Sequence, residues 1–185
     1  MAYWTARLVG GAPLQNVALG LSASREYYND VVNSLYVTYL GRQSDTPGLN
    51  SWVDKVVAGT GIESIRVDIV SSQEYYNDGG ATPVGYIAQL YQAFLQRAPD
   101  AGGLANWQQT LAGPGGTAAV AGGFVYAAEN YNDVIKGYYQ TYLQRVADDG
   151  GVTIWVNSLE SGTAESQIIA DFVSSAEYLV HHGVA

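Results

Sequence analysis

The chain has 185 residues, of which 48% are apolar and 14% charged, and it contains no cysteine. A chain of this size can bury a core without disulfides, and a thiolate metal site is excluded. Its 17 acidic and 8 basic residues give a formal charge of −9, which repels phosphate backbones and anionic lipids. We therefore predict no nucleic-acid partner. No apolar run approaches the roughly 18 residues of a membrane span, so no membrane insertion is predicted.

The N-terminal segment is predicted to be a truncated copy of a repeat. Trp4 precedes Glu26 of the heptapeptide SREYYND by 22 residues, and three later Trp–Glu pairs share this spacing: Trp52 and Glu74, Trp107 and Glu129, Trp155 and Glu177. This half copy lacks the Arg–Asp segment that the later copies carry. We expect the following copy to cover its apolar residues, and we expect all four tryptophans to be mostly buried.

The first full copy contains LYVTYLGRQSDTPGLNSW at residues 35–52 and is predicted to be helical. Its apolar residues recur at helical spacing, among them Leu49, Trp52, Val53, Val56 and Val57. Asp45 is the predicted N-cap of that helix. Thr60 and Glu63 form a predicted capping box for the next helix, and SQEYYND at 72–78 repeats the opening motif.

Two further copies follow, with LYQAFLQRAPDAGGLANW at 90–107 and YYQTYLQRVADDGGVTIW at 138–155. The tryptophans lie 48, 55 and 48 residues apart, and the extra residues fall in GGATPVG, residues 79–85. We predict a hinge at 79–85 between residues 1–78 and residues 86–185. The fold class is all-α: tandem repeats of about 48 residues, each of three to four short helices that share a continuous core.

The recurring tyrosine motif provides the candidate ligand-binding residues. Adjacent helical positions point about 100° apart, so one tyrosine of each pair is expected to face outward beside asparagine. The candidates are Tyr27, Tyr28, Asn29, Tyr75, Tyr76, Asn77, Tyr131 and Asn132. Such residues suit a carbohydrate platform, and they equally suit a polar helix junction, so both interpretations stay open.

The Arg–x–x–Asp loops are interpreted as structural, because a packing device must recur in every copy whereas an active site is normally singular. Oxygen ligands for calcium could come from Asp45, Asp100, Asp148 and Asp149. No loop has the carboxylate density of a calcium loop, so no metal and no cofactor is predicted. No nucleophile–base pair is recognisable, and an enzyme is not predicted. An unrecognised acid pair would require two carboxylates converging in one pocket.

The pattern LYxxxLxRxxDxxGLxxW, followed by an aliphatic helix and SxEY, resembles the bacterial domain of unknown function (DUF) 4214 family, which is distantly similar to phycobilisome linker domains. The third copy departs by having Val152 for leucine. The second has Ala127 where the others have Ser24, Ser72 and Ser175. The resemblance implies a bacterial protein that is secreted or located at the cell surface, often as part of a larger protein, and it carries over no catalytic residues.

These observations lead to two expectations of function. The first is a non-catalytic interaction module that mediates adhesion by binding a polysaccharide or another cell-surface component. The second is a structural scaffold that self-associates and has no ligand of its own. The exposure of the tyrosines separates the two.

Overall fold

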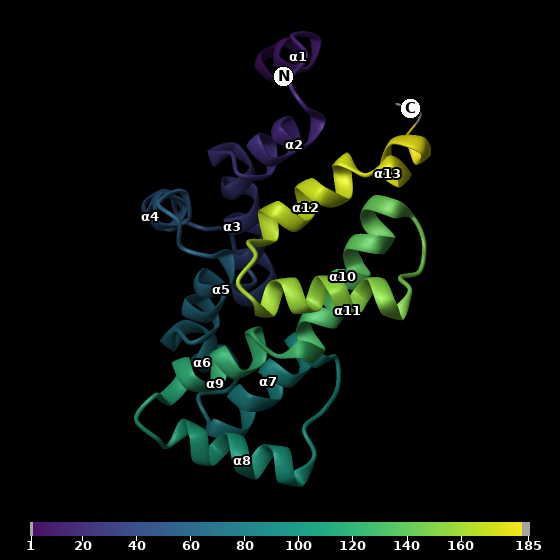
Figure 1. Cartoon of the computed structure of the whole chain (residues 1–185). Coiled ribbons are helices and arrows are strands. Elements are labelled where there is room, and N and C mark those ends of the chain that lie inside the picture. The colour runs from purple at the N-terminus through teal and green to yellow at the C-terminus, as the bar shows by residue number, and fades with distance from the viewer. Residues whose placement is uncertain (1, 183–185) are drawn as a thin grey trace. The chain divides into compact units, whose positions relative to one another are not determined.

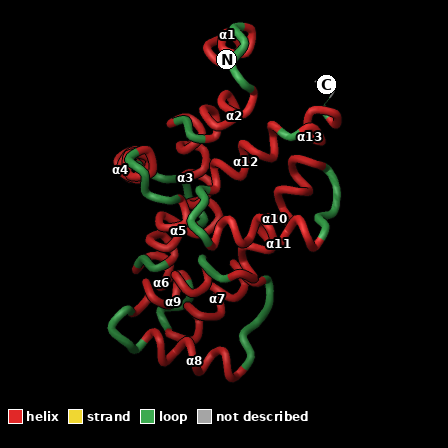
Figure 2. Tube along the Cα trace, in the orientation of Figure 1, coloured by secondary structure: helices red, strands yellow, loops and turns green. Residues whose placement is uncertain are grey.

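The computed structural model describes residues 2–182, which form thirteen helices joined by short turns and no strand (Figures 1 and 2). The prediction of an all-α repeat fold is therefore confirmed. None of these helices is long and apolar enough to cross a membrane. The half copy contributes α1 (Ala2–Val9) and α2 (Leu14–Ser22); the first full copy α3 (Arg25–Leu40), α4 (Thr46–Val57), α5 (Ile62–Val70) and α6 (Gln73–Asp78); the second α7 (Pro83–Leu95), α8 (Ala101–Leu111) and α9 (Gly116–Val125); the third α10 (Ala128–Leu143), α11 (Asp149–Glu160), α12 (Glu165–Ser174) and α13 (Ala176–His181).

Helix starts follow the sequence signals in part. The Asp45 carboxylate accepts a hydrogen bond from the backbone N–H of Gly48 at 2.8 Å, as expected for the N-cap of α4. The predicted capping box of Thr60 and Glu63 is wrong. Helix α5 begins one residue later than that box requires, with Gly61 as its N-cap and no side-chain hydrogen bond to the cap.

The predicted apolar stripe of α4 is broader than the face that the helix buries. Val53 and Val56 are buried, whereas Val57 is exposed. Trp52 is half-buried, and so are the tryptophans of the other three copies. The expectation that these indoles are mostly buried is corrected accordingly. Each tryptophan lies at the rim of its helix pair, where one part of the ring packs on protein and the rest meets solvent.

The helices form two compact units. The inner unit is Asn29–Asn130, and the terminal unit combines the residues up to Tyr28 with those from Tyr131 onward. The division falls inside α3 and α10, and both sides of residues 79–85 lie in the inner unit. The predicted boundary at 79–85 is therefore not where the units meet.

In the inner unit the first and second full copies pack together. Helix α5 lies against α9, and α7 contacts α6, α8 and α9. One face of α7 is buried, with no exposed surface at Tyr86, Ile87 or Leu90. Its later residues Tyr91 and Phe94 contact the ring of Phe124 on α9. These aromatic contacts make α7 the central helix of the unit.

In the terminal unit the half copy packs on the third copy, with α2 lying along α12 (Figure 1). The Gln15 amide donates to the Asp171 carboxylate at 2.6 Å, and the Ser22 hydroxyl donates to the Ser166 carbonyl at 2.8 Å. The half copy is thus integral to a unit, as expected. The partner differs from the expectation, because its cover comes from the last copy and not from the copy that follows it.

The segment at 79–85 forms a tight capped turn. The Thr82 hydroxyl accepts from the backbone N–H of Gly85 at 3.1 Å and caps α7. A β-carbon at Gly85 would lie 1.8 Å from the Gly79 carbonyl oxygen, so the two glycines allow the backbone to approach itself closely. The extra residues of this copy form the turn between α6 and α7.

Candidate functional site

The most regular polar feature is an arginine held between a glutamate and a tyrosine. The Arg42 guanidinium donates to Glu74 through Nε at 2.5 Å and Nη2 at 2.7 Å. It lies 5.1 Å from the centroid of the Tyr36 ring, a cation–π arrangement. The Tyr36 hydroxyl accepts from Nε1 of Trp52 at 3.0 Å. The recurring Arg, Glu and Trp of the sequence pattern therefore meet around one tyrosine.

The same arrangement occurs in the other full copies: Arg97 with Glu129 and Tyr91, and Arg145 with Glu177 and Tyr139. The hydrogen bonds from Arg42 lower the pKa of Glu74, and those from Arg145 lower the pKa of Glu177. Both partners of each pair keep a large exposed fraction, so solvent screens the interaction. These groups hold one helix end against the next and present no reactive atom.

The aspartates considered as calcium ligands act as helix caps. Asp100 and Asp148 accept from the backbone N–H groups of Gly103 and Gly151, as Asp45 does in the first copy. These hydrogen bonds lower the pKa of Asp100 and of Asp148. The fourth candidate, Asp149, lies in the first turn of α11. Across residues 2–182 no group of three His, Asp or Glu side chains is arranged to hold a metal ion.

The tyrosine candidates are not brought together into one platform. Tyr75 is 1% exposed and Tyr131 is 5% exposed, so no ligand reaches the face of either ring. Tyr75 meets Tyr39 and Tyr86 edge-on, and burial raises its pKa. Both residues are withdrawn as ligand-binding candidates, because their rings are used in the cores.

The remaining candidates lie nearer the surface. Tyr27, Tyr28, Asn29 and Asn132 are half-buried. Tyr76 is also half-buried and packs against Tyr86, and Asn77 is exposed and accepts from the Gln73 amide at 2.8 Å. All of these residues except Asn77 are therefore only partly accessible to a ligand.

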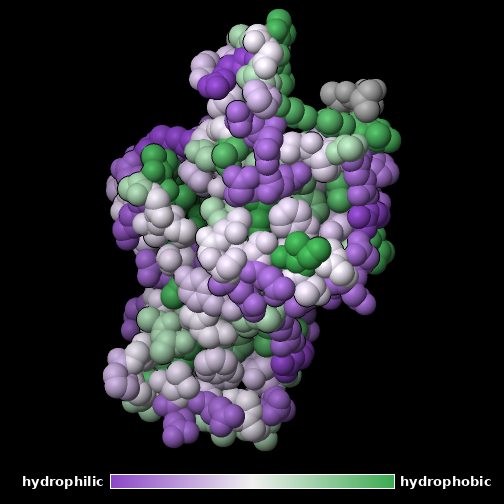
Figure 3. All heavy atoms as spheres, viewed as in Figure 1, coloured by the Kyte–Doolittle hydropathy of each residue, from purple (hydrophilic) through white to green (hydrophobic). Residues whose placement is uncertain are grey.

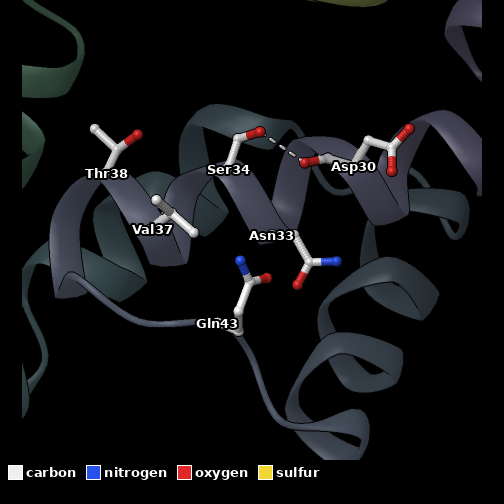
Figure 4. Close-up of a pocket in the computed structure, with 6 residues that line it drawn as sticks. All are labelled: Asp30, Asn33, Ser34, Val37, Thr38 and Gln43. Carbon is white, nitrogen blue, oxygen red and sulfur yellow. Dashed lines mark hydrogen bonds between the residues drawn. The ribbon is translucent and has the colours of Figure 1, made fainter.

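A second feature, which the sequence reasoning missed, is an open hollow of about 460 Å³ beside α3 and the loop that follows it. Its lining is polar except for Val37: Asp30, Asn33, Ser34, Val37, Thr38 and Gln43. Figure 4 shows the Gln43 side chain rising from the loop towards the helix, between Val37 and Asn33. The Ser34 hydroxyl donates to the Asp30 carbonyl at 2.8 Å, and Ser44 donates to the Asn33 side chain.

The residues that line the hollow are not all repeated along the sequence. The second copy has Ala88, Ala93 and Ala98 at the positions of Asn33, Thr38 and Gln43, and the third has Lys136, Gly137 and Val146 at those of Asn33, Ser34 and Gln43. In the sequence, the hollow could have been suspected only because the residues at these positions differ between the copies. Asp30 is the single carboxylate of the lining, so the hollow does not supply an acid pair.

Comparison with known proteins gives the family. The model of the domain of unknown function DUF4214 matches residues 28–79, 67–134 and 131–182, so that each match contains most or all of one full copy. No curated protein and no solved structure matches the chain. The three matches cover most of the sequence and agree with the copies delimited by the recurring tryptophans. The chain therefore belongs to the DUF4214 family, as a tandem array of its repeat.

Proposed function

We propose that the chain is a non-catalytic interaction module of a secreted or cell-surface bacterial protein, and that it binds a polysaccharide through the hollow beside α3. The observation that carries this proposal is a polar, open depression, several of whose lining residues are replaced at the aligned positions of the other copies. The Arg–Glu–Tyr arrangement occurs in every full copy, as a packing device must. A binding site does not have to recur in every copy, and the surface residues that line the hollow differ from those at the aligned positions of the other copies.

The chemistry of the lining suits a hydroxyl-rich ligand. The amides of Asn33 and Gln43 both donate and accept hydrogen bonds, and the Asp30 carboxylate only accepts. The exposed Val37 supplies apolar contact for the C–H face of a sugar ring. No large aromatic face lines the hollow, so we expect weak binding by a single site and firm retention only on a repeating polymer.

The test is a glycan-array screen of the whole chain beside a variant carrying Thr38→Ala and Gln43→Ala. The second copy has alanine at both aligned positions, so the fold accepts these residues. Loss of two hydrogen-bonding side chains should weaken retention about tenfold. The matched control changes Gln140 and Thr141 of the third copy, which are also exposed, to alanine. Equal retention of all three proteins at equal melting temperature would refute the hollow as the site.

The burial of the tyrosines favours a second candidate, a structural scaffold. Tyr75 and Tyr131 belong to the cores. Each arginine–glutamate pair joins two residues of the same unit, and none joins the inner unit to the terminal unit. The recurring residues are thus used in holding the array together. A scaffold predicts no retained glycan and concentration-dependent association. Sedimentation velocity over a hundredfold range of concentration distinguishes this outcome from a monomer that binds sugar.

A further inference from the structure

The terminal unit repeats the inner unit helix by helix, with one position unfilled. Helices α11, α12 and α13 of the third copy correspond to α4, α5 and α6 of the first. Helices α1 and α2 of the half copy correspond to α8 and α9 of the second. The α2–α12 packing matches the α9–α5 packing. No helix of the described chain corresponds to α7 in the terminal unit.

The unfilled position leaves apolar side chains uncovered. Leu21 aligns with Ile69, Phe124 and Phe172, which are 3%, 1% and 3% exposed, yet Leu21 is 45% exposed. Leu8 aligns with Val56 and Leu159, which are buried, yet Leu8 is 43% exposed. In Figure 3 apolar atoms lie uncovered along α1, at the top of the view. The half copy thus lacks the cover that the same positions have in the full copies.

In the second and third copies that cover comes from the copy's own first helix. Phe124 is met by Tyr91 and Phe94, with ring centroids 5.0 and 6.4 Å away. Phe172 is met in the same way by Tyr139 and Tyr142, at 5.0 and 6.3 Å. The covering residues share a pattern, Tyr-x-x-(Tyr/Phe)-x-x-Arg, whose arginine is the one that binds the glutamate 32 residues later.

Glu26 is the fourth glutamate of this series, and it lacks its arginine. Glu74, Glu129 and Glu177 each bind the arginine 32 residues earlier, which lies just beyond the end of α3, α7 or α10. Glu26 is exposed and forms no ion pair within residues 2–182. The same missing helix therefore accounts for an uncovered leucine and an unpaired carboxylate.

We propose that the terminal unit binds an amphipathic helix of a partner protein, and that this helix carries the pattern Tyr-x-x-(Tyr/Phe)-x-x-Arg. Its aromatic residues cover Leu21, and its arginine pairs with Glu26. A second copy of this chain is not the occupant, because Arg42, Arg97 and Arg145 are already bound to their own glutamates. A first helix from another repeat of the same family has the required residues. This site lies in the terminal unit and is separate from the hollow beside α3.

The probe is a fluorescent synthetic peptide with the sequence of residues 82–97, TPVGYIAQLYQAFLQR, titrated with the whole chain. We expect saturable binding with a rise in anisotropy. Glu26→Gln should weaken it about threefold to fivefold, the usual effect of a surface ion pair. Leu21→Asp should weaken it at least about tenfold, because it places a charge in the apolar contact. A peptide with Arg97→Gln should bind weakly to wild type and should be insensitive to Glu26→Gln.

Two controls match these changes in chemistry. Val9→Asp also replaces an exposed aliphatic residue of the half copy, at a position that is glutamate, Glu160, in the third copy. Glu160→Gln removes an exposed carboxylate of the same unit. Both should leave peptide affinity unchanged. Thermal melts of each variant show whether the fold is intact.

Three results would overturn the proposal. The first is the absence of saturable binding at millimolar peptide. The second is binding to Leu21→Asp and Glu26→Gln with wild-type affinity, which would place the peptide elsewhere, for example in exchange with α7. The third is a dimer of the whole chain that Leu21→Asp dissociates, since a second copy would then occupy the face.

Discussion

Trp107 covers Gly123 so closely that a β-carbon at the glycine would lie 2.3 Å from Cη2 of the indole. Trp4 stands in the same relation to Gly20, at 2.5 Å, and the two pairs occupy aligned positions of the repeat. The half copy therefore packs its tryptophan helix on its glycine helix as the second copy does. The recurrence of this contact within one chain indicates that the two helix pairs share the same local packing.

Substitution of the two neighbouring glycines of α9 should have opposite effects on stability. Gly123→Ala displaces an indole that also packs against Phe124, and we expect it to destabilise the protein by about 1–3 kcal/mol. A β-carbon at Gly122 would lie 3.9 Å from the Tyr126 ring, an ordinary van der Waals distance. Gly122→Ala should therefore stabilise the helix by up to about 1 kcal/mol. Chemical denaturation of both variants measures the difference. A stabilising Gly123→Ala would show that the indole moves aside at no cost.

The missing serine of the second copy leads to a reciprocal pair of variants. Ser24, Ser72 and Ser175 each cap the helix that follows, because the serine hydroxyl accepts a hydrogen bond from the backbone N–H three residues later. Ala127 has no side-chain oxygen and cannot accept this bond. Ala127→Ser should stabilise the protein by about 1 kcal/mol, and Ser72→Ala should destabilise it by a similar amount. Melting temperatures of the two variants and wild type provide the test. No change in either would mean that these caps contribute little in this array.

Local signals in the sequence predicted the fold well, because caps and helical periodicity act within a few residues. Asp45 caps α4 as predicted, and Gly59, with φ +103°, follows the end of that helix. The pairing of α2 with α12 was not predictable in this way. It joins segments more than 140 residues apart, and local helix propensity does not indicate which copy packs against α2.

The site was less predictable because tyrosine suits both a core and a surface. The same EYYND motif buries Tyr75 and leaves Tyr76 half-buried, and only the packing of neighbouring helices decides which is which. The hollow beside α3 depends on where the loop places Gln43 relative to Asn33. Spacing along one helix carries no information about that loop.

The arginine–glutamate pairs predict how stability depends on pH. Glu74 and Glu177 have lowered pKa values in the folded protein, so the stabilisation is fully present above the unfolded-state pKa, about 4.3. It is lost as the pH falls through the folded-state value. The free-energy difference between wild type and Arg145→Gln should therefore shrink between about pH 5 and pH 2. Urea unfolding at several pH values measures it, with Lys136→Gln as control. A difference that grows on acidification would contradict the assignment.

The pairing of the half copy with the last copy predicts an intramolecular cross-link. The Gln15 amide and the Asp171 carboxylate are in hydrogen-bond contact at 2.6 Å, although 156 residues separate them. The chain has no native cysteine, so Gln15→Cys with Asp171→Cys provides the only two thiols. A short bis-maleimide should join them within one molecule and close a large loop, which migrates faster on a denaturing gel. Each single variant and the double variant in urea should show no such band. A folded double variant that gives only intermolecular products would refute the packing of α2 on α12.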